Sequence, residues 1–152
     1  KLVDHLGLTN IKIMRPDEEK LKAEDPNGML FASDVAKCCY LRKVEPLQRA
    51  LEGYDAWLTG RKRFHGGERD ALPVIEPAGS RIKINPLAGY KREDIEDIFE
   101  HRALPRHPLE AEGFLSIGCM PCTERVDPNT TDVRAGRWAG QDKTECGIHY
   151  II

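Results

Sequence analysis

The sequence lacks three features that would place it in a membrane or on a nucleic acid. It has no run of about 18 apolar residues, the length that a membrane-spanning helix needs. Residues 1–10 contain no apolar core, so we expect no secretory signal peptide there. The net charge of −2 gives no general attraction to nucleic acid or to a membrane surface. These absences favour a cytoplasmic protein without nucleic-acid or membrane partners.

A disulfide scaffold is also disfavoured. The chain has five cysteines, an odd number, in 152 residues. Small secreted domains that depend on disulfide bonds carry cysteines at higher density and in even number. In a reducing compartment, clustered cysteines more often bind a metal or take part in catalysis. The cysteines are therefore the first candidates for function.

The remaining composition predicts a globular α/β protein. Hydrophobic residues make up 40% of the chain and charged residues 32%, enough for one domain with a sizeable core. Helical and strand-like patterns alternate along the sequence, which favours the α/β class. After Cys122 the composition becomes polar and glycine-rich, so we expect residues 123–152 to form a mobile tail of a single domain, residues 1–152. The expected elements are a helix over 38–53 broken or kinked at Pro46, a buried strand over 56–60, a hairpin from 73–76 and 81–87, and an amphipathic helix over 91–105.

Four cysteines form two pairs far apart in the sequence. Cys119 and Cys122 make a Cys-x-x-Cys motif, which can chelate a metal or form a redox disulfide. Cys38 and Cys39 are adjacent, and adjacent side chains point apart in regular structure, so both would strain to reach one small tetrahedral ion. In an iron–sulfur cubane each could bind a different iron. The pattern favours an iron–sulfur cluster, with zinc and two buried apolar cysteines as alternatives.

The fifth cysteine, Cys146, lies in the sequence Glu-Cys-Gly-Ile-His near the C-terminal end. A neighbouring glycine in a mobile tail would let a thiol enter and leave a site, and Lys143 and His149 could favour its thiolate while Glu145 opposes it. The residues alone leave a catalytic nucleophile and an incidental thiol equally open.

Two basic segments could bind an anion. Arg134 and Arg137 lie three apart on a glycine-bearing segment, and arginine forks suit sulfate or phosphate. Residues 61–69 form a basic, glycine-containing loop after the predicted strand, the place where an α/β sheet positions an anionic ligand. Solvated surface residues remain the alternative in both cases. The five histidines show no metal-ligand spacing, and we interpret each as structural or incidental.

Four collinear motifs resemble the iron–sulfur branch of the adenylyl-sulfate (APS) and phosphoadenylyl-sulfate (PAPS) reductase family, the assimilatory APS reductases. They are Cys38-Cys39 followed by Arg-Lys-Val-Glu-Pro-Leu after two intervening residues, Ala-Trp-Leu-Thr-Gly-Arg-Lys-Arg, Ser-Ile-Gly-Cys-Met-Pro-Cys-Thr with Arg-Ala-Gly-Arg-Trp, and the terminal Glu-Cys-Gly-Ile-His. The resemblance implies a Rossmann-like sheet of the adenine-nucleotide alpha-hydrolase type.

The resemblance also implies an activity. It is the thioredoxin-dependent reduction of APS to sulfite and AMP in sulfate assimilation and cysteine biosynthesis, through a thiosulfonate on Cys146. Thioredoxin or a similar dithiol would regenerate the enzyme. The implied cofactor is a [4Fe-4S] cluster on Cys38, Cys39, Cys119 and Cys122, with an electrostatic and structural role beside the sulfate. The implied substrate-binding residues are Lys43, Gly60, Arg69, Arg134 and Arg137.

One family motif has no counterpart here. The family carries a Ser-Gly-Gly-x-Asp-Ser loop after its first strand, and the only similar residues, His65-Gly66-Gly67, lack the serines and occur too late. We therefore expect the chain to correspond to the C-terminal two-thirds of such an enzyme. A PAPS reductase and a non-catalytic, metal-stabilised nucleotide-binding module are the alternatives. The cysteine pairs favour APS, since typical PAPS reductases lack them, and the oligomeric state stays open.

Overall fold

The computed structural model describes residues 1–127 and 129–150. Pro128, Ile151 and Ile152, which belong to the expected tail, lie outside the described residues. Backbone contacts divide the chain into two units. The first contains residues 1–11, 60–74 and 85–144, and the second contains 12–59, 75–84 and the residues from Glu145 onward. The predicted α/β class is confirmed, because helices accompany a small mixed sheet.

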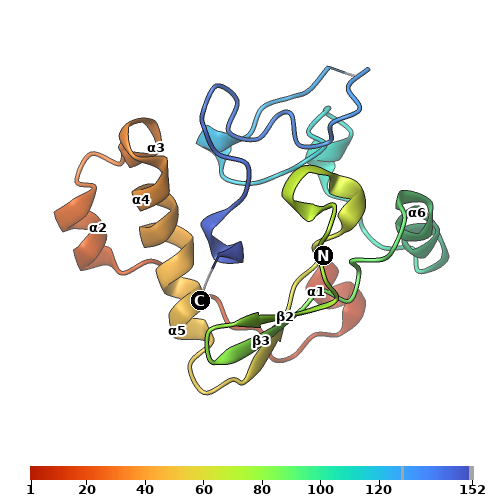
Figure 1. The fold of residues 1–152 in the computed structure, drawn as a ribbon, viewed down its shortest axis with the longest axis horizontal. Helices are drawn as coiled ribbons and strands as arrows, with labels where there is room; N and C mark the ends of the chain where they lie inside the picture. Colours follow the sequence, from red (N-terminus) through yellow and green to blue (C-terminus); the bar gives the residue numbers. More distant parts are fainter. Residues whose placement is uncertain (128, 151–152) are drawn as a thin grey trace. The chain divides into compact units, whose positions relative to one another are not determined.

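In the second unit, α2 and α3 are followed by a long helical segment made of α4, η1 and α5. Asp17 caps α2 by accepting hydrogen bonds from the backbone N–H groups of Glu19 and Lys20, both at 3.0 Å. Figure 1 shows α4 and α5 as one continuous column. The bounds are α2 (Glu18–Glu24), α3 (Leu30–Ser33), α4 (Val35–Cys39), the π-helical turn η1 (Tyr40–Val44) and α5 (Glu45–Ala50).

The predicted helix over 38–53 is confirmed, with shifted ends and without an interruption at Pro46. The backbone stays helical through Val44 and Glu45, and Pro46 lies in the first turn of α5. Proline has no N–H to donate and its ring crowds the preceding turn of an α-helix. The π turn η1 directly precedes it, and such turns are a common way to change the hydrogen-bond register inside a helix. The hydrogen-bond pattern of the helix therefore changes before Pro46 and not at it.

A mixed three-stranded sheet belongs to the second unit, in the order β1-β3-β2. Its strands are β1 (Ala56–Leu58), β2 (Ile75–Ala78) and β3 (Arg81–Ile84); β1 runs parallel to β3, and β2 runs antiparallel to it. The predicted hairpin is confirmed. Pro77 is tolerated in β2 because this strand lies at an edge of the sheet.

The faces of this sheet differ from the sequence-based expectation. The segment over 56–60 was expected to be a buried strand, but Leu58 is 70% exposed. Ile82, which lies on the same face by strand register, is 48% exposed. Lys83, on the opposite face, is only 3% exposed and pairs with Glu76 at 3.3 Å. The alternation of Ile82, Lys83 and Ile84 thus predicted a strand correctly, while the packed face is the one that carries the lysine.

The first unit contains short helices joined by turns. The predicted amphipathic helix over 91–105 is confirmed as the shorter α6 (Arg92–His101), which begins where Asp94 accepts a hydrogen bond from the Lys91 backbone N–H at 2.7 Å. The other helical elements are α1 (Leu2–Leu6) and the 3₁₀ turns η2 (Arg63–His65), η3 (Gly67–Arg69), η4 (Pro108–Glu110) and η5 (Met120–Cys122). One further 3₁₀ turn, η6 (Gly147–His149), belongs to the second unit.

Over the ranges 1–127 and 129–150, no helix has both the length and the apolar character that a bilayer crossing would require.

Candidate active site

Cys146 lies at the N-terminal end of η6, in the second unit. Cys146 is buried, with 7% of its surface exposed. The turn η6 packs against η1 and α4, the segments that carry Lys43 and Cys39. The Lys43 Nζ lies 3.8 Å from the Cys146 Sγ, and the Cys146 backbone N–H donates to Glu145 Oε1 at 2.9 Å. The structure therefore brings two predicted site residues, Lys43 and Cys146, into contact.

The surroundings of Cys146 favour its thiolate. The pKa of the thiol is lowered to about 5, chiefly by a side-chain hydrogen bond with Cys39. The backbone N–H of Ile148 and the positive charge of Lys43 act in the same direction, while burial and the Glu145 carboxylate oppose them. A buried thiol with a lowered pKa beside a lysine is suited to act as a nucleophile.

Gly147 allows this close packing. A Cβ atom at this position would lie 3.0 Å from Val44 Cγ2 and 4.0 Å from Cys39 Cβ. The sequence had suggested this glycine as a source of mobility for the thiol, and that role stays a prediction. Its role in the described structure is steric.

Cys38, next to Cys39, has a different partner. Arg42, four residues further along the helix, donates from its Nη1 to the Cys38 Sγ at 3.7 Å. The same guanidinium forms an ion pair with the buried Asp25 at 2.6 Å, and the Leu30 backbone N–H donates to that carboxylate at 3.1 Å. Arg42 is thus held between a carboxylate and a thiol. Neither Arg42 nor Asp25 is among the site residues predicted from the sequence: the arginine lies four residues after Cys38, and Asp25 belongs to none of the quoted motifs.

In the first unit, the Cys-x-x-Cys motif forms a tight turn. Cys119 precedes η5, and the Cys122 backbone N–H donates to the Cys119 carbonyl oxygen at 3.0 Å. Thr123 closes the turn, because its hydroxyl donates to the same carbonyl at 2.8 Å and accepts from the Gly118 N–H at 3.1 Å. Two thiols three residues apart are therefore held on one turn.

Arg137 braces this turn. Its Nε donates to the Cys122 carbonyl oxygen at 3.1 Å and its Nη1 donates to the Ile117 carbonyl oxygen at 3.2 Å. The guanidinium lies 4.3 Å from the ring centroid of Trp138, which is 3% exposed. A Cβ atom on Gly118 would lie only 2.2 Å from the Arg137 guanidinium. The predicted anion-binding arginine is thus packed directly against the Cys-x-x-Cys segment.

Arg134 holds the segment that leads to Cys146. Its Nη2 donates to the Thr144 carbonyl oxygen at 2.8 Å, and its guanidinium lies 5.6 Å from the Trp138 ring centroid. The Thr144 hydroxyl also forms a short hydrogen bond with the Glu68 carboxylate. Glu68 and Thr144 were not identified from the sequence, since 76 residues separate them.

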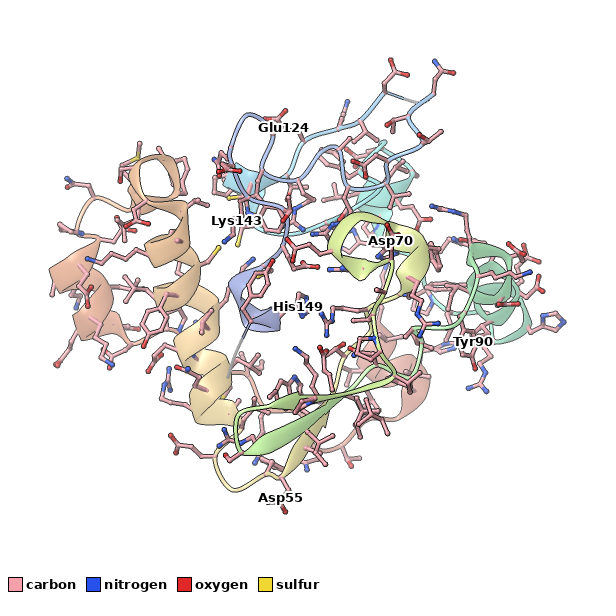
Figure 2. The ribbon with its side chains drawn as sticks, in the orientation of Figure 1. Asp55, Asp70, Tyr90, Glu124, Lys143 and His149 are labelled. Carbon is pink, nitrogen blue, oxygen red and sulfur yellow. The ribbon has the colours of Figure 1, made fainter. Side chains whose placement is uncertain are left out.

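Arg69 ends a double turn that begins after Gly60. The backbone reverses at Gly66 and Gly67, whose φ angles are 70° and 62°. This reversal brings η3 back toward η2, so that Arg69, 7% exposed, places its Nη1 3.1 Å from His65 Nδ1. Figure 2 labels Asp70, which directly follows Arg69 at the end of this turn. From the sequence, His65 is interpreted as structural or incidental, and its spacing of four residues from Arg69 across two glycines is the available signal.

His65 is held in its neutral form. Burial and the positive charges of Lys62, Arg69, Arg134 and Arg92 lower the pKa of its imidazole to about 4. Burial and Arg69 also lower the pKa of Lys62. The loop 61–69 and Arg134 therefore form a region of concentrated positive charge in the first unit.

The ten predicted site residues are divided between the units. Cys38, Cys39, Lys43 and Cys146 belong to the second unit, and Gly60, Arg69, Cys119, Cys122, Arg134 and Arg137 belong to the first. All five cysteines lie in the described ranges, and none forms a disulfide bond there. No group of three or more His, Cys, Asp or Glu side chains within those ranges is arranged to hold a single metal ion.

Comparison with known proteins places these features in a family. Residues 1–125 match the family described as phosphoadenosine phosphosulfate reductase domain. A protein of Mesorhizobium japonicum named adenosine 5'-phosphosulfate reductase is 53% identical over 148 residues, which cover 97% of this chain and 58% of that protein. A protein of the same name from Chelativorans sp. is 50% identical, over 98% of this chain and 60% of that protein. The chain thus spans less than two thirds of the length of these relatives.

A solved structure supports the same relationship. The crystal structure of phosphoadenylyl-sulfate (PAPS) reductase from Candida auris, in a phosphate complex, is 34% identical with a TM-score of 0.54. The similarity covers 68% of this chain and 50% of that one. The expected α/β fold of the adenine-nucleotide alpha-hydrolase type is confirmed by this similarity. The chain therefore belongs to the phosphoadenosine phosphosulfate reductase family.

Proposed function

We propose that the chain supplies the catalytic thiol of an adenylyl-sulfate reductase, which reduces APS to sulfite and AMP with electrons from thioredoxin or a similar dithiol. One observation carries the proposal: a buried Cys146 whose thiolate is favoured by Lys43 and Cys39. The names of the relatives that are about half identical to the chain support APS as the substrate.

The reaction follows from nucleophilic attack by this thiolate. The Cys146 sulfur attacks the sulfur atom of the sulfate group, and the bond from that atom to the phosphate oxygen breaks. The oxygen leaves with the electron pair as AMP, and Cys146 carries the –SO₃⁻ group. A thiolate of the reductant then attacks the Cys146 sulfur, and sulfite leaves with the electron pair. The second thiol of the reductant resolves the mixed disulfide and returns Cys146 to the thiolate.

The cationic residues have separate tasks in this proposal. Lys43 stabilises the Cys146 thiolate before attack and faces the sulfate as it transfers. Arg134 and Arg137 bind the phosphosulfate, and Gly60 and Arg69 line the nucleotide site. The concentrated positive charge around His65 supports the presence of an anion site in the first unit.

Four cysteines fit a [4Fe-4S] cluster by their chemistry. Cys38 and Cys39 are adjacent on one helix, Cys119 and Cys122 share one turn, and none of the four is consumed by a disulfide bond within the described ranges. Thiolates are the ligands that such clusters require. When bound, such a cluster would have an electrostatic and structural role. A protein with such a cluster and a reduced nucleophile belongs in a reducing compartment, and we propose the cytoplasm.

Sulfite formation from APS with a dithiol reductant, measured with the full-length protein, tests this reaction. Cys146→Ser should abolish sulfite formation, while the iron and labile sulfide content of the purified protein stays at the level of the wild type. Full activity in Cys146→Ser would show that another group is the nucleophile. Zinc without iron or labile sulfide in fresh protein would instead favour the metal-stabilised nucleotide-binding module.

PAPS reduction is the second candidate, and the similarity to the Candida auris PAPS reductase favours it. The two nucleotides differ in a 3′-phosphate, so a comparison of kcat/KM for APS and PAPS separates the candidates. The proposal predicts the higher value for APS. A higher value for PAPS would overturn the substrate assignment while leaving the role of Cys146 intact.

A further inference from the structure

The contact between His65 and Arg69 determines which ring nitrogen of His65 carries the proton. His65 Nδ1 lies 3.1 Å from Arg69 Nη1. A guanidinium only donates hydrogen bonds, so Nδ1 must accept, and the ring proton must therefore lie on Nε2. A protonated imidazole would instead point an N–H at a cation. The contact exists only while His65 is neutral.

The surroundings of the ring hold it in place. The imidazole and the Phe64 ring form a T-shaped pair, with the ring centroids 4.7 Å apart and the planes perpendicular. The Arg92 guanidinium covers Phe64 at 5.2 Å from its centroid. Burial is the largest cause that lowers the pKa of His65, and the positive charges of Lys62, Arg69, Arg134 and Arg92 add to it, so the imidazole is neutral across the physiological pH range.

We propose that His65 is a positioning residue for Arg69: its Nδ1 accepts a hydrogen bond from the guanidinium and holds it in the orientation that binds an anionic phosphoryl group of an adenine nucleotide. The inference rests on the proposed function, which places Arg69 in the nucleotide site. A guanidinium loses rotational freedom when it binds a phosphate, and a fixed acceptor reduces that loss before the ligand arrives. Arg69 is also nearly buried, at 7% exposed, which restricts the orientations it can adopt.

Binding of AMP by isothermal titration calorimetry tests this role in the complete protein. His65→Leu removes the acceptor and should weaken AMP binding by roughly tenfold. His65→Asn keeps an acceptor near the position of Nδ1 and should recover most of the affinity. His101→Leu, a change at an exposed histidine of α6, is the matched control and should bind as the wild type does.

Each result decides a separate point. Wild-type affinity in His65→Leu would overturn the inference while the proposed function stands. A wild-type protein that fails to bind AMP would overturn the proposed nucleotide site, and the inference with it. In case His65→Leu does not fold, nitrogen-15 NMR of the wild-type imidazole gives an independent readout. It should show a proton on Nε2 and a bare Nδ1 at pH 7 and at pH 5.5, and a protonated Nδ1 at either pH would contradict the proposed contact.

Discussion

The Lys83 ammonium donates a hydrogen bond to the carbonyl oxygen of His149 at 2.8 Å. Lys83 lies on the middle strand of the sheet and is 3% exposed, and it also pairs with Glu76 and lies 5.7 Å from the centroid of the Trp57 ring. His149, labelled in Figure 2, ends the turn η6 that follows Cys146. A buried cation of the sheet therefore anchors the turn that carries the proposed nucleophile.

Lys83→Met should loosen this anchor. The substitution keeps the apolar stem but removes one hydrogen bond to the His149 carbonyl and one ion pair with the Glu76 carboxylate, so the free energy of unfolding should fall by about 1–3 kcal/mol. Urea denaturation measures this loss, and alkylation of Cys146 by iodoacetamide should become faster in the variant. Lys91→Met is the matched control, because the pair of Lys91 with Glu93 is exposed and should contribute less than about 0.5 kcal/mol. Equal stability of the two variants would contradict the anchoring role.

The sequence predicted this part of the fold only in outline. Alternation of Ile82, Lys83 and Ile84 identified a strand, since a period of two residues is a local property. It could not identify the packed face, because the partners of Lys83 are Glu76, seven residues away, and His149, 66 residues away. At Pro46, the residue type predicted a disturbance in the helix, but not that it would take the form of the π turn before the proline.

The candidate site shows the same division. Cysteine and arginine spacing predicted the cysteine pairs and the two arginines of residues 134–138, and the family resemblance implied Lys43, which the structure brings to Cys146. Partners distant in sequence, such as Asp25 for Arg42 and Glu68 for Thr144, leave no local pattern. His65 was missed for another reason, since a single histidine in a basic loop has many structural explanations.

Gly118 and Arg137 should behave as a coupled pair. A Cβ at Gly118 would overlap the guanidinium, which is the mobile end of a long side chain, so Gly118→Ala should displace Arg137 from the Ile117 and Cys122 carbonyls. We expect losses of about 1 kcal/mol in the free energy of unfolding for Gly118→Ala and for Arg137→Ala. The double variant should lose little more than either single one, because both remove the same contacts. Additive losses in a urea-denaturation cycle would count against the coupling.

Gly136 offers a contrast to Gly118. Here an added Cβ would lie 2.2 Å from the backbone carbonyl oxygen of Glu124, and the Glu124 N–H donates to the Gly136 carbonyl at 2.8 Å. The Glu124 backbone can move away from such a Cβ only if the isolated β-bridge between Thr123 and Arg137 opens. Gly136→Ala should therefore lower the free energy of unfolding more than Gly118→Ala does, and Arg137→Ala should not rescue it. A smaller loss than in Gly118→Ala, measured in the same denaturation series, would show that the bridge tolerates the change.

The neutral His65 should make the protein sensitive to acid. Its pKa is about 4 in the folded state, below the usual value of 6.5, so between these pH values the unfolded chain takes up a proton that the folded chain does not. Protons therefore favour unfolding, and stability present above about pH 6.5 falls as the pH drops toward 4. His65→Asn should lose less stability than the wild type between pH 7 and pH 5, as measured by urea denaturation at each pH. Parallel losses in the two proteins would assign the acid sensitivity to other groups.

The helical segment that contains η1 has a consequence for its two adjacent cysteines. Cys38 shares its surroundings with Arg42 and the buried Asp25, whereas Cys39 lies against Cys146, whose cation is Lys43. The two adjacent thiols therefore differ in solvent exposure and in the side chains that contact each sulfur. A small thiol-specific label should react faster with Cys38, the more exposed of the two, than with Cys39. Trypsin leaves both cysteines on one peptide, residues 38–42, so fragmentation of that peptide by mass spectrometry would show which sulfur carries the label.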